Sequence, residues 1–327
     1  MRIVIFGPAK KTGALVNGQV VDLSSAYAAF AEGTKSAGHI HASVPVRLDD
    51  FIAGGKPTLA AAQDAIDFAT AKADPSFVVD ASKVRLHAPW PGRRMAMAAS
   101  NYAAHIAGIQ QNTYGRSGGI AAVETAAVEM RKSGQFGFFK IVDDVRASGD
   151  DVPYPKRTKF LDYEGEASII LGKRGSDIKA SQIEEYVWGV TLFNDWTIRD
   201  KAEQRALQYN VMKCFDGAAT IGPCIVVGEY DFRNIDVETR VNGEIRQQFN
   251  SKDMVFSFGE ILEHLSRDFT FMPGDIISGG TGAGTAADTT KPLPDGTRPL
   301  DKFLKVGDVV EVSSPQIGTI RNRLVAK

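Results

Sequence analysis

The stretch LDYEGEASIILGK, residues 161–173, alternates between apolar and polar positions and contains three carboxylates. Successive side chains of a β-strand point to opposite faces, so the pattern predicts a strand over 161–171. One face is then apolar, and the other carries Asp162, Glu164 and Glu166. Neighbouring carboxylates on that face would stand ~7 Å apart. At an effective dielectric constant of about 20, each neighbouring pair would repel by roughly 2 kcal/mol.

This acidic face has two interpretations. On a solvated face, water reduces the repulsion and the carboxylates are ordinary surface groups. In a cleft, they need a cation, or one of them must take up a proton. Glu164 and Glu166 could then supply oxygen ligands to a hard divalent ion, with water molecules completing its shell. No basic residue is interleaved on the acidic face.

The chain after residue 136 is rich in predicted strands separated by turn signals. Further strands are predicted at 138–142, 187–193, 220–228, 236–241, 275–279 and 308–313. Ser257 and Glu260 form a capping box ahead of one helix. Many strands with few helices predict a mixed α/β, β-rich fold with a curled, barrel-like sheet, and not a doubly wound α/β fold.

The N-terminal part has a different character. Asn17-Gly18 predicts a hairpin turn, and the Ala-rich segment 59–73 predicts a helix with Thr58 as its N-cap. A Pro-rich change in composition near 74–84 indicates a boundary. We therefore expect a small N-terminal α+β domain over 1–80 and a catalytic domain over 81–327.

Four further residues are candidates for a site. Asp195 ends an apolar strand, where an acid is ordinarily a helix cap or turn residue, or else a third metal ligand, and Arg199 follows it as a candidate anion clamp. Lys213 lies between apolar groups just before the strand TIGPCIV. His105 is the best candidate base among the five histidines, because it falls on the first turn of a helix capped by Asn101.

The segment 108–135 follows His105 and is punctuated by Gly and Ser around one helix. Such a segment is either a plain surface excursion or a mobile lid. We expect a lid here, which would exclude bulk water from the site.

Bulk composition excludes several partners. The 327 residues carry a net charge of −1, with a pI of about 6.5, so nothing points to nucleic acid or to an anionic membrane. No apolar run approaches the ~18 residues that span a bilayer, and the N-terminus predicts a strand and not a signal peptide. Cys214 and Cys224 make no metal or redox spacing, which predicts a reducing, cytoplasmic setting.

Two enzyme classes are disfavoured by context. GGTGAG at 279–284 follows a predicted strand, but prolines stand where a dinucleotide-binding helix would continue, which argues against a nicotinamide oxidoreductase. Residues 115–119, GRSGG, match G-x-S-x-G, but no predicted strand precedes them as a nucleophile elbow requires, which argues against a nucleophile-elbow hydrolase.

Several motifs in series resemble the fumarylacetoacetate hydrolase superfamily over roughly 85–327. The matching stretches are ASNYAAHIAG, FGFFK, LDYEGEASIILGK, GVTLFNDWTIRD, KCFDGAATIGPCIV, VNGEIRQ, DMVFSFGEILEHLS, MPGDIISGGTGAG and FLKVGDVVEVSSPQIGTIRNRLV. The resemblance implies that the metal ligands are Glu164, Glu166 and Asp195, that the catalytic residues include His105 and Lys213, and that the substrate contacts include Arg199, Thr281 and Tyr102.

The chain departs from the family pattern beside the histidine. Many members carry a Glu three residues after it, where this chain has Gly108. We therefore expect Glu124 or Glu129, from the helix in the lid, to orient His105. The departures affect the substrate shell, so they put the substrate's identity in doubt and not the class of chemistry.

The resemblance implies a Mg²⁺-dependent hydrolase, with Mn²⁺ or Ca²⁺ as alternatives, that cleaves a carbon–carbon bond of a β-diketo or acylpyruvate-type acid through an enolate. A decarboxylase or isomerase of a β-keto or 2-hydroxy-dienoic acid in aromatic-compound catabolism is the alternative within the family. A non-catalytic β-rich binding protein with a solvated acidic strand is the alternative of another class. The family's usual assembly implies a homodimer, with a small-molecule keto acid as the ligand.

Overall fold

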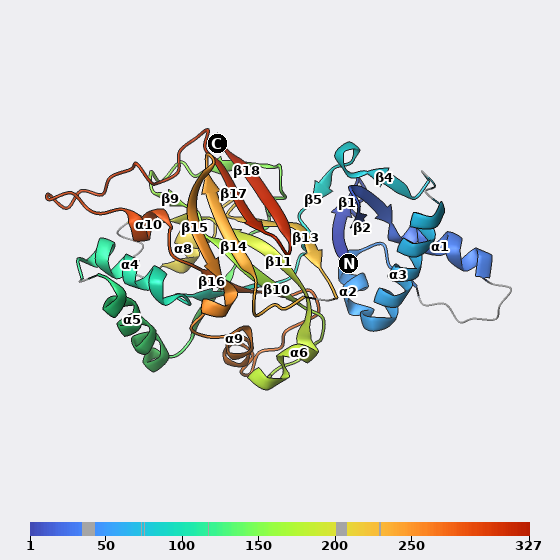
Figure 1. Ribbon diagram of the computed structural model, residues 1–327, viewed down its shortest axis with the longest axis horizontal. Coiled ribbons are helices and arrows are strands. Elements are labelled where there is room, and N and C mark those ends of the chain that lie inside the picture. The colour runs from blue at the N-terminus through green and yellow to red at the C-terminus, as the bar shows by residue number, and fades with distance from the viewer. Residues whose placement is uncertain (35–42, 73, 75, 117, 201–207, 229) are drawn as a thin grey trace.

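The computed structural model describes residues 1–34, 43–72, 74, 76–116, 118–200, 208–228 and 230–327 (Figure 1). Its main feature is an 11-stranded mixed sheet whose path runs from β4 to β7, so the sheet is open and not a closed barrel. In spatial order the strands are β4 (Val78–Asp80), β3 (Gln19–Asp22), β2 (Lys11–Val16), β1 (Arg2–Phe6), β13 (Ala219–Val226), β11 (Val187–Asp195), β10 (Gly165–Leu171), β16 (Ile276–Thr281), β6 (Met95–Ala99) and β7 (Phe136–Lys140), and β5 (Leu86–His87) pairs with β1.

The N-terminal strands extend this sheet. β1 pairs antiparallel with β13, with Ile3 opposite Ile225. The hairpin β2–β3 turns at Asn17 and Gly18, whose φ angles of 48° and 78° are those of a type I′ turn. Three helices pack beside these strands, at the right of Figure 1: α1 (Leu23–Thr34), α2 (Leu48–Ala53) and α3 (Gly55–Lys72). The prediction of Thr58 as an N-cap is wrong, because α3 already begins at Gly55.

A second, five-stranded sheet packs against the first. Its order is β15 (Glu244–Asn250), β14 (Asp236–Val241), β17 (Val309–Ser314), β18 (Gly318–Ala326) and β8 (Asp151–Tyr154). Ile169 and Leu192 of the large sheet share a buried cluster with Val312 and Ile320 of the small sheet. Gly165 permits a close approach, since a Cβ there would overlap Thr239 Oγ1.

The remaining helices and strands among the described residues lie outside these two sheets. They are α4 (Ala103–Tyr114), α5 (Ile120–Ser133), α6 (Ile183–Tyr186), α8 (Tyr209–Lys213), α9 (Phe258–Leu265), α10 (Ala286–Thr289), η2 (Ala81–Lys83), η3 (Ala180–Gln182), η4 (Ser251–Asp253) and the strand pair β9 (Leu161–Asp162) with β12 (Thr197–Ile198). The capping box of Ser257 and Glu260 at α9 is confirmed. No helix among the described residues is long and apolar enough to cross a bilayer.

Helix α4 does not begin as expected. Its N-cap position is Tyr102, and the Asn101 side chain instead donates to the carbonyls of Phe256 and Gly279. Asn101 also accepts from the Phe256 N–H at 2.8 Å. Asn101 therefore fastens the start of α4 to the segment before α9 and to β16.

Candidate active site

Three carboxylates converge at the ends of two neighbouring strands. Glu166 lies on β10, Glu164 just before it, and Asp195 at the end of β11, and the antiparallel register sets Glu166 opposite Phe193. One oxygen of each carboxylate lies within 4.8 Å of the others. All three residues are buried, at 4% or less exposure, so the interpretation of a solvated acidic face is wrong.

Asp162 does not join the three. The predicted strand over 161–171 is interrupted after Asp162, and the Glu164 N–H donates to the side-chain oxygen of Asn194 on β11, at 3.1 Å, and not to a backbone carbonyl. The Asp162 carboxylate turns away and accepts from the N–H groups of Ala286 and Ala287, at 2.8 and 3.1 Å.

Two buried cations that the sequence indicated do reach the carboxylates. Lys213 Nζ lies 2.7 Å from Asp195 Oδ2 and also donates to Glu164 and Thr197. Arg199 donates from Nη2 to Glu164 and from Nε to Asp162, the latter at 3.1 Å. Burial acts to lower the pKa of Lys213, but the charges of Asp195 and Glu164 outweigh it and raise that pKa, so the side chain is an ammonium.

A third cation, Lys140 of β7, was not predicted. Its Nζ lies 2.6 Å from Asp195 Oδ1 and also donates to the Lys213 carbonyl. Burial lowers the pKa of Lys140, while Asp195 acts in the opposite direction. The available signal was a lysine ending the apolar strand FGFFK, which is an unusual place for a charge.

Among the described residues, Glu166 is the one carboxylate of the three without an ion-pair partner. In that part of the chain it accepts only from the Ser278 hydroxyl. Burial, together with the charges of Asp195 and Glu164, raises the pKa of Glu166 well above its ordinary value. A buried set of three carboxylates with one left uncompensated is a donor set that fits a hard divalent cation.

His105 is oriented by Asp288, which the sequence did not indicate. Its Nδ1 lies 2.6 Å from Asp288 Oδ2, and both side chains are buried. The expectation that Glu124 or Glu129 pairs with His105 is wrong, because both are exposed on α5. Asp288 lies 183 residues from His105 in sequence, within a Thr- and Ala-rich segment that gave no catalytic signal.

Besides Arg199, two further substrate contacts were predicted, and they differ in their position relative to the cavity. Thr281 lines the cavity, donates to the Gly165 carbonyl at 2.9 Å and accepts from Gln247 at 2.8 Å. Tyr102 is not among the described residues that line the cavity. Its ring packs edge-on against Phe249, and its buried hydroxyl has no hydrogen-bond partner in the described part of the chain.

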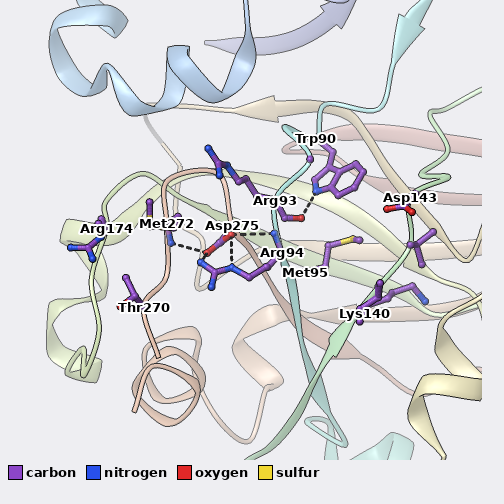
Figure 2. Close-up of a pocket in the computed structure, with 13 residues that line it drawn as sticks. Trp90, Arg93, Arg94, Met95, Lys140, Asp143, Arg174, Thr270, Met272 and Asp275 are labelled. Atoms are coloured by element: carbon purple, nitrogen blue, oxygen red, sulfur yellow. Dashed lines mark hydrogen bonds and ion pairs between the residues drawn. The ribbon is translucent and has the colours of Figure 1, made fainter. Parts of the chain in front are cut away.

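These groups enclose a cavity of about 60 Å³. The lining residues that bear on its chemistry are His105, Phe138, Glu164, Glu166, Asp195, Arg199, Tyr209, Lys213 and Thr281. A larger cavity of about 650 Å³ lies elsewhere, beside the Arg94–Asp275 ion pair at the opposite end of β16 (Figure 2). The carboxylates therefore lie in the smaller and more enclosed of these two cavities.

Comparisons with known proteins agree with this fold. A family model described as the C-terminal domain of fumarylacetoacetate (FAA) hydrolase matches residues 94–325. The chain is 32% identical over 289 residues to an oxaloacetate tautomerase of Bacillus subtilis (strain 168), covering 86% of this chain and 87% of that protein.

Solved structures give the same result. A fumarylacetoacetate hydrolase from Exiguobacterium antarcticum is similar with a TM-score of 0.71 at 27% identity, over 100% of both chains. A fumarylpyruvate hydrolase from Pseudomonas aeruginosa, solved in complex with Mn²⁺ and pyruvate, is similar with a TM-score of 0.56 at 28% identity, over 73% of this chain and 91% of that one.

Proposed function

The chain belongs to the fumarylacetoacetate hydrolase family, and from this premise we propose that it is a divalent-metal-dependent enzyme that forms the enolate of a short 2-keto acid. The observation that carries the proposal is the enclosure, in one cavity, of three buried carboxylates, two cations and a histidine held by an aspartate. Enolate chemistry needs these parts, namely positive charge beside an oxygen and a base beside a carbon.

Glu164, Glu166 and Asp195 would hold the cation, for which we propose Mg²⁺, with Mn²⁺ or Ca²⁺ as alternatives. When bound, the cation would supply Lewis-acid polarisation of a substrate keto oxygen. The Pseudomonas aeruginosa relative, whose structure holds Mn²⁺ and pyruvate, supports a divalent ion and a 2-keto acid.

His105 is the proposed general base. A carboxylate at Nδ1 favours the tautomer that keeps a proton there, which leaves the Nε2 lone pair free to accept a proton from substrate or water. Lys213 and Arg199 add positive charge next to the position where the enolate oxygen would develop. Thr281 would contact the substrate from the cavity wall. Tyr102, which packs against Phe249 outside the described lining of the cavity, stays a predicted substrate contact.

Two reactions are consistent with this machinery. Keto–enol tautomerisation of a short keto diacid is favoured by the small cavity and by the relative from Bacillus subtilis, which is similar over most of both chains. Carbon–carbon bond hydrolysis of an acylpyruvate is the second candidate. It is supported by the His105–Asp288 pair, an arrangement that can activate a water molecule, and by the hydrolase relatives.

A panel assay separates the candidates. Oxaloacetate and a series of acylpyruvates are incubated with Mg²⁺ or Mn²⁺, with EDTA as the control; enol absorbance is followed and products are identified by NMR. Metal-dependent enol decay without carbon–carbon cleavage supports the tautomerase, and release of pyruvate with a second acid supports the hydrolase. Equal rates with EDTA, or no turnover of any keto acid, would contradict the proposal.

We also propose that the protein is cytoplasmic, because both cysteines are free thiols, as is usual in a reducing compartment.

We further propose that the protein is a homodimer. The last strand of the large sheet, β7, and its continuation expose apolar Phe136, Phe139 and Ile141 to 48%, 37% and 75%, and exposed apolar edge strands invite pairing with a second copy. Light scattering should give twice the mass of 35.3 kDa, and Ile141→Lys should shift it toward the monomer.

A further inference from the structure

Asp162 is a buried carboxylate for which the proposed chemistry has no direct use. Its side chain is fully buried, lies outside the three-carboxylate cluster and receives four hydrogen bonds. Oδ1 accepts from the N–H groups of Tyr163 and Ala286, at 3.0 and 2.8 Å. Oδ2 accepts from the Ala287 N–H and from Arg199 Nε, both at 3.1 Å.

Through Arg199, Asp162 is connected to the cluster of proposed metal ligands. Arg199 donates from Nε to Asp162 and from Nη2 to Glu164, so its planar guanidinium spans the two carboxylates. Because Arg199 is buried and rigidly forked, the position of Asp162 limits where the guanidinium can lie beside Glu164.

Through helix α10, Asp162 is also connected to His105, the proposed general base. Asp162 holds the first two N–H groups of α10, and Asp288 is the third residue of the same helix. The Asp288 carboxylate accepts from the Gly284 N–H at 3.0 Å and meets His105 Nδ1 at 2.6 Å. A shift of the start of α10 would therefore move the group that orients His105.

We propose that Asp162 is a positioning residue that fixes the His105–Asp288 pair relative to the Arg199–Glu164 pair. The inference rests on the proposed function for its catalytic meaning, but its geometry can be tested without turnover. Both oxygens of Asp162 accept two donors each, so an Asn in either orientation would set its NH₂ group against two of them. Asp162→Asn is therefore a nearly isosteric change that breaks the link.

Asp275 supplies a matched control. It is also fully buried and accepts four hydrogen bonds, from Arg94 N, Nε and Nη2 and from the Met272 N–H. Figure 2 shows this carboxylate beside the larger cavity. It lies directly before β16, six residues before Thr281 of the proposed site, or ~20 Å along a strand. Asp275→Asn thus removes an equivalent buried carboxylate far from His105.

The first measurement needs no substrate. In the wild type, the proton between His105 and Asp288 should give a low-field ¹H NMR signal, identified by its loss in His105→Ala. We expect Asp162→Asn to weaken or remove this signal and to speed amide exchange at Ala286 and Ala287, whereas Asp275→Asn leaves both unchanged. A folded Asp162→Asn protein with the wild-type signal and wild-type exchange would overturn the proposal, whatever the enzyme's reaction.

The second measurement tests the catalytic consequence. We expect Asp162→Asn to lower kcat by about 10- to 100-fold with a smaller change in KM, and to cause little further loss in a His105→Ala background. An additive loss in that double variant would show that Asp162 does not act through His105. If no keto acid is turned over by the wild type, the proposed function fails, while the NMR measurement still decides the positioning role.

Thr285→Val tests the same link should Asp162→Asn fail to fold. Thr285 caps α10, with its hydroxyl accepting from the Asp288 N–H at 3.3 Å. Loosening this cap should also weaken the His105 signal. A fully retained signal would overturn the proposal, because the orientation of His105 would then not depend on how the start of α10 is held.

Discussion

Gly108 and Asp288 lie so close that a side chain at 108 would occupy the space of the aspartate. A Cβ at position 108 would lie 2.8 Å from Asp288 Cβ and 2.9 Å from its carbonyl oxygen. The contact joins α4, which carries His105, to α10, and Asn112 of α4 also donates to the Asp288 carbonyl. Asp288 therefore occupies the space that a Glu side chain at position 108 would need, and it takes the place of that Glu beside His105.

This contact predicts an unusual result for Gly108→Ala. In a helix, Gly to Ala ordinarily stabilises by about 1 kcal/mol. Here the new methyl group would push α4 from α10, so we expect the free energy of unfolding to fall by about 1–3 kcal/mol and turnover to fall with it. Urea denaturation measures the first effect. Gly33→Ala in α1, where a Cβ meets open space, is the control and should be neutral or stabilising; equal effects of the two changes would contradict the contact.

The His105–Asp288 pair makes a second prediction. Asp288→Asn should lower kcat by about 10- to 100-fold, because the amide no longer holds His105 in the tautomer with a free Nε2. Glu124→Gln and Glu129→Gln serve as controls, since both carboxylates are exposed on α5. Steady-state kinetics on the best keto acid decides. A loss in either control comparable to that in Asp288→Asn would restore the lid acids as candidates.

Local pattern marked the three carboxylates as candidates, and the resemblance to the fumarylacetoacetate hydrolase superfamily joined them into one set of metal ligands. Glu164 and Glu166 stand out through strand alternation, and Asp195 through the end of the neighbouring strand. Lys140 and Asp288 could not be found in this way. Lys140 reaches Asp195 across 55 residues and Asp288 reaches His105 across 183, and no periodicity within a strand or helix encodes such pairs.

In the fold too, the elements marked by local pattern were predicted and the pairings between distant segments were not. The predicted strands 138–142, 187–193 and 236–241 overlap β7, β11 and β14, since apolar alternation and turn residues mark them. The strands β8, β15 and β18 were not predicted. The extension of the large sheet through β1 and β13 depends on pairing between distant segments, which composition and turn signals do not specify.

Replacing one proposed metal ligand at a time should affect Mn²⁺ binding and the stability of the metal-free protein differently. Glu166→Gln should abolish Mn²⁺ binding in calorimetry yet leave the metal-free protein as stable as the wild type or more so, because Glu166 forms no ion pair among the described residues. Glu164→Gln should also abolish binding but cost about 3 kcal/mol, because Arg199 and Lys213 each lose one of their two carboxylate partners in a buried site.

The thermal shift caused by Mn²⁺ and reversed by EDTA gives an independent measure of the same binding. It should be present in the wild type and absent in both variants. Glu238→Gln, on β14 outside the cluster, is the control and should keep the wild-type shift. Unchanged Mn²⁺ affinity in Glu166→Gln would refute its assignment as a ligand.

Lys140 was not among the site residues predicted from sequence, yet its charge pairs with Asp195, so its removal tests how much this buried ion pair stabilises the protein. Lys140→Met keeps the apolar stem but leaves Asp195 facing one ammonium instead of two, so the free energy of unfolding should fall by about 3–5 kcal/mol. Lys173→Met removes an exposed partner of Glu185 at a similar N···O distance, and should change stability by less than about 1 kcal/mol. The two pairs differ mainly in burial, at 0% and 50% lysine exposure, so equal effects would mean that the Lys140–Asp195 pair is not buried in solution.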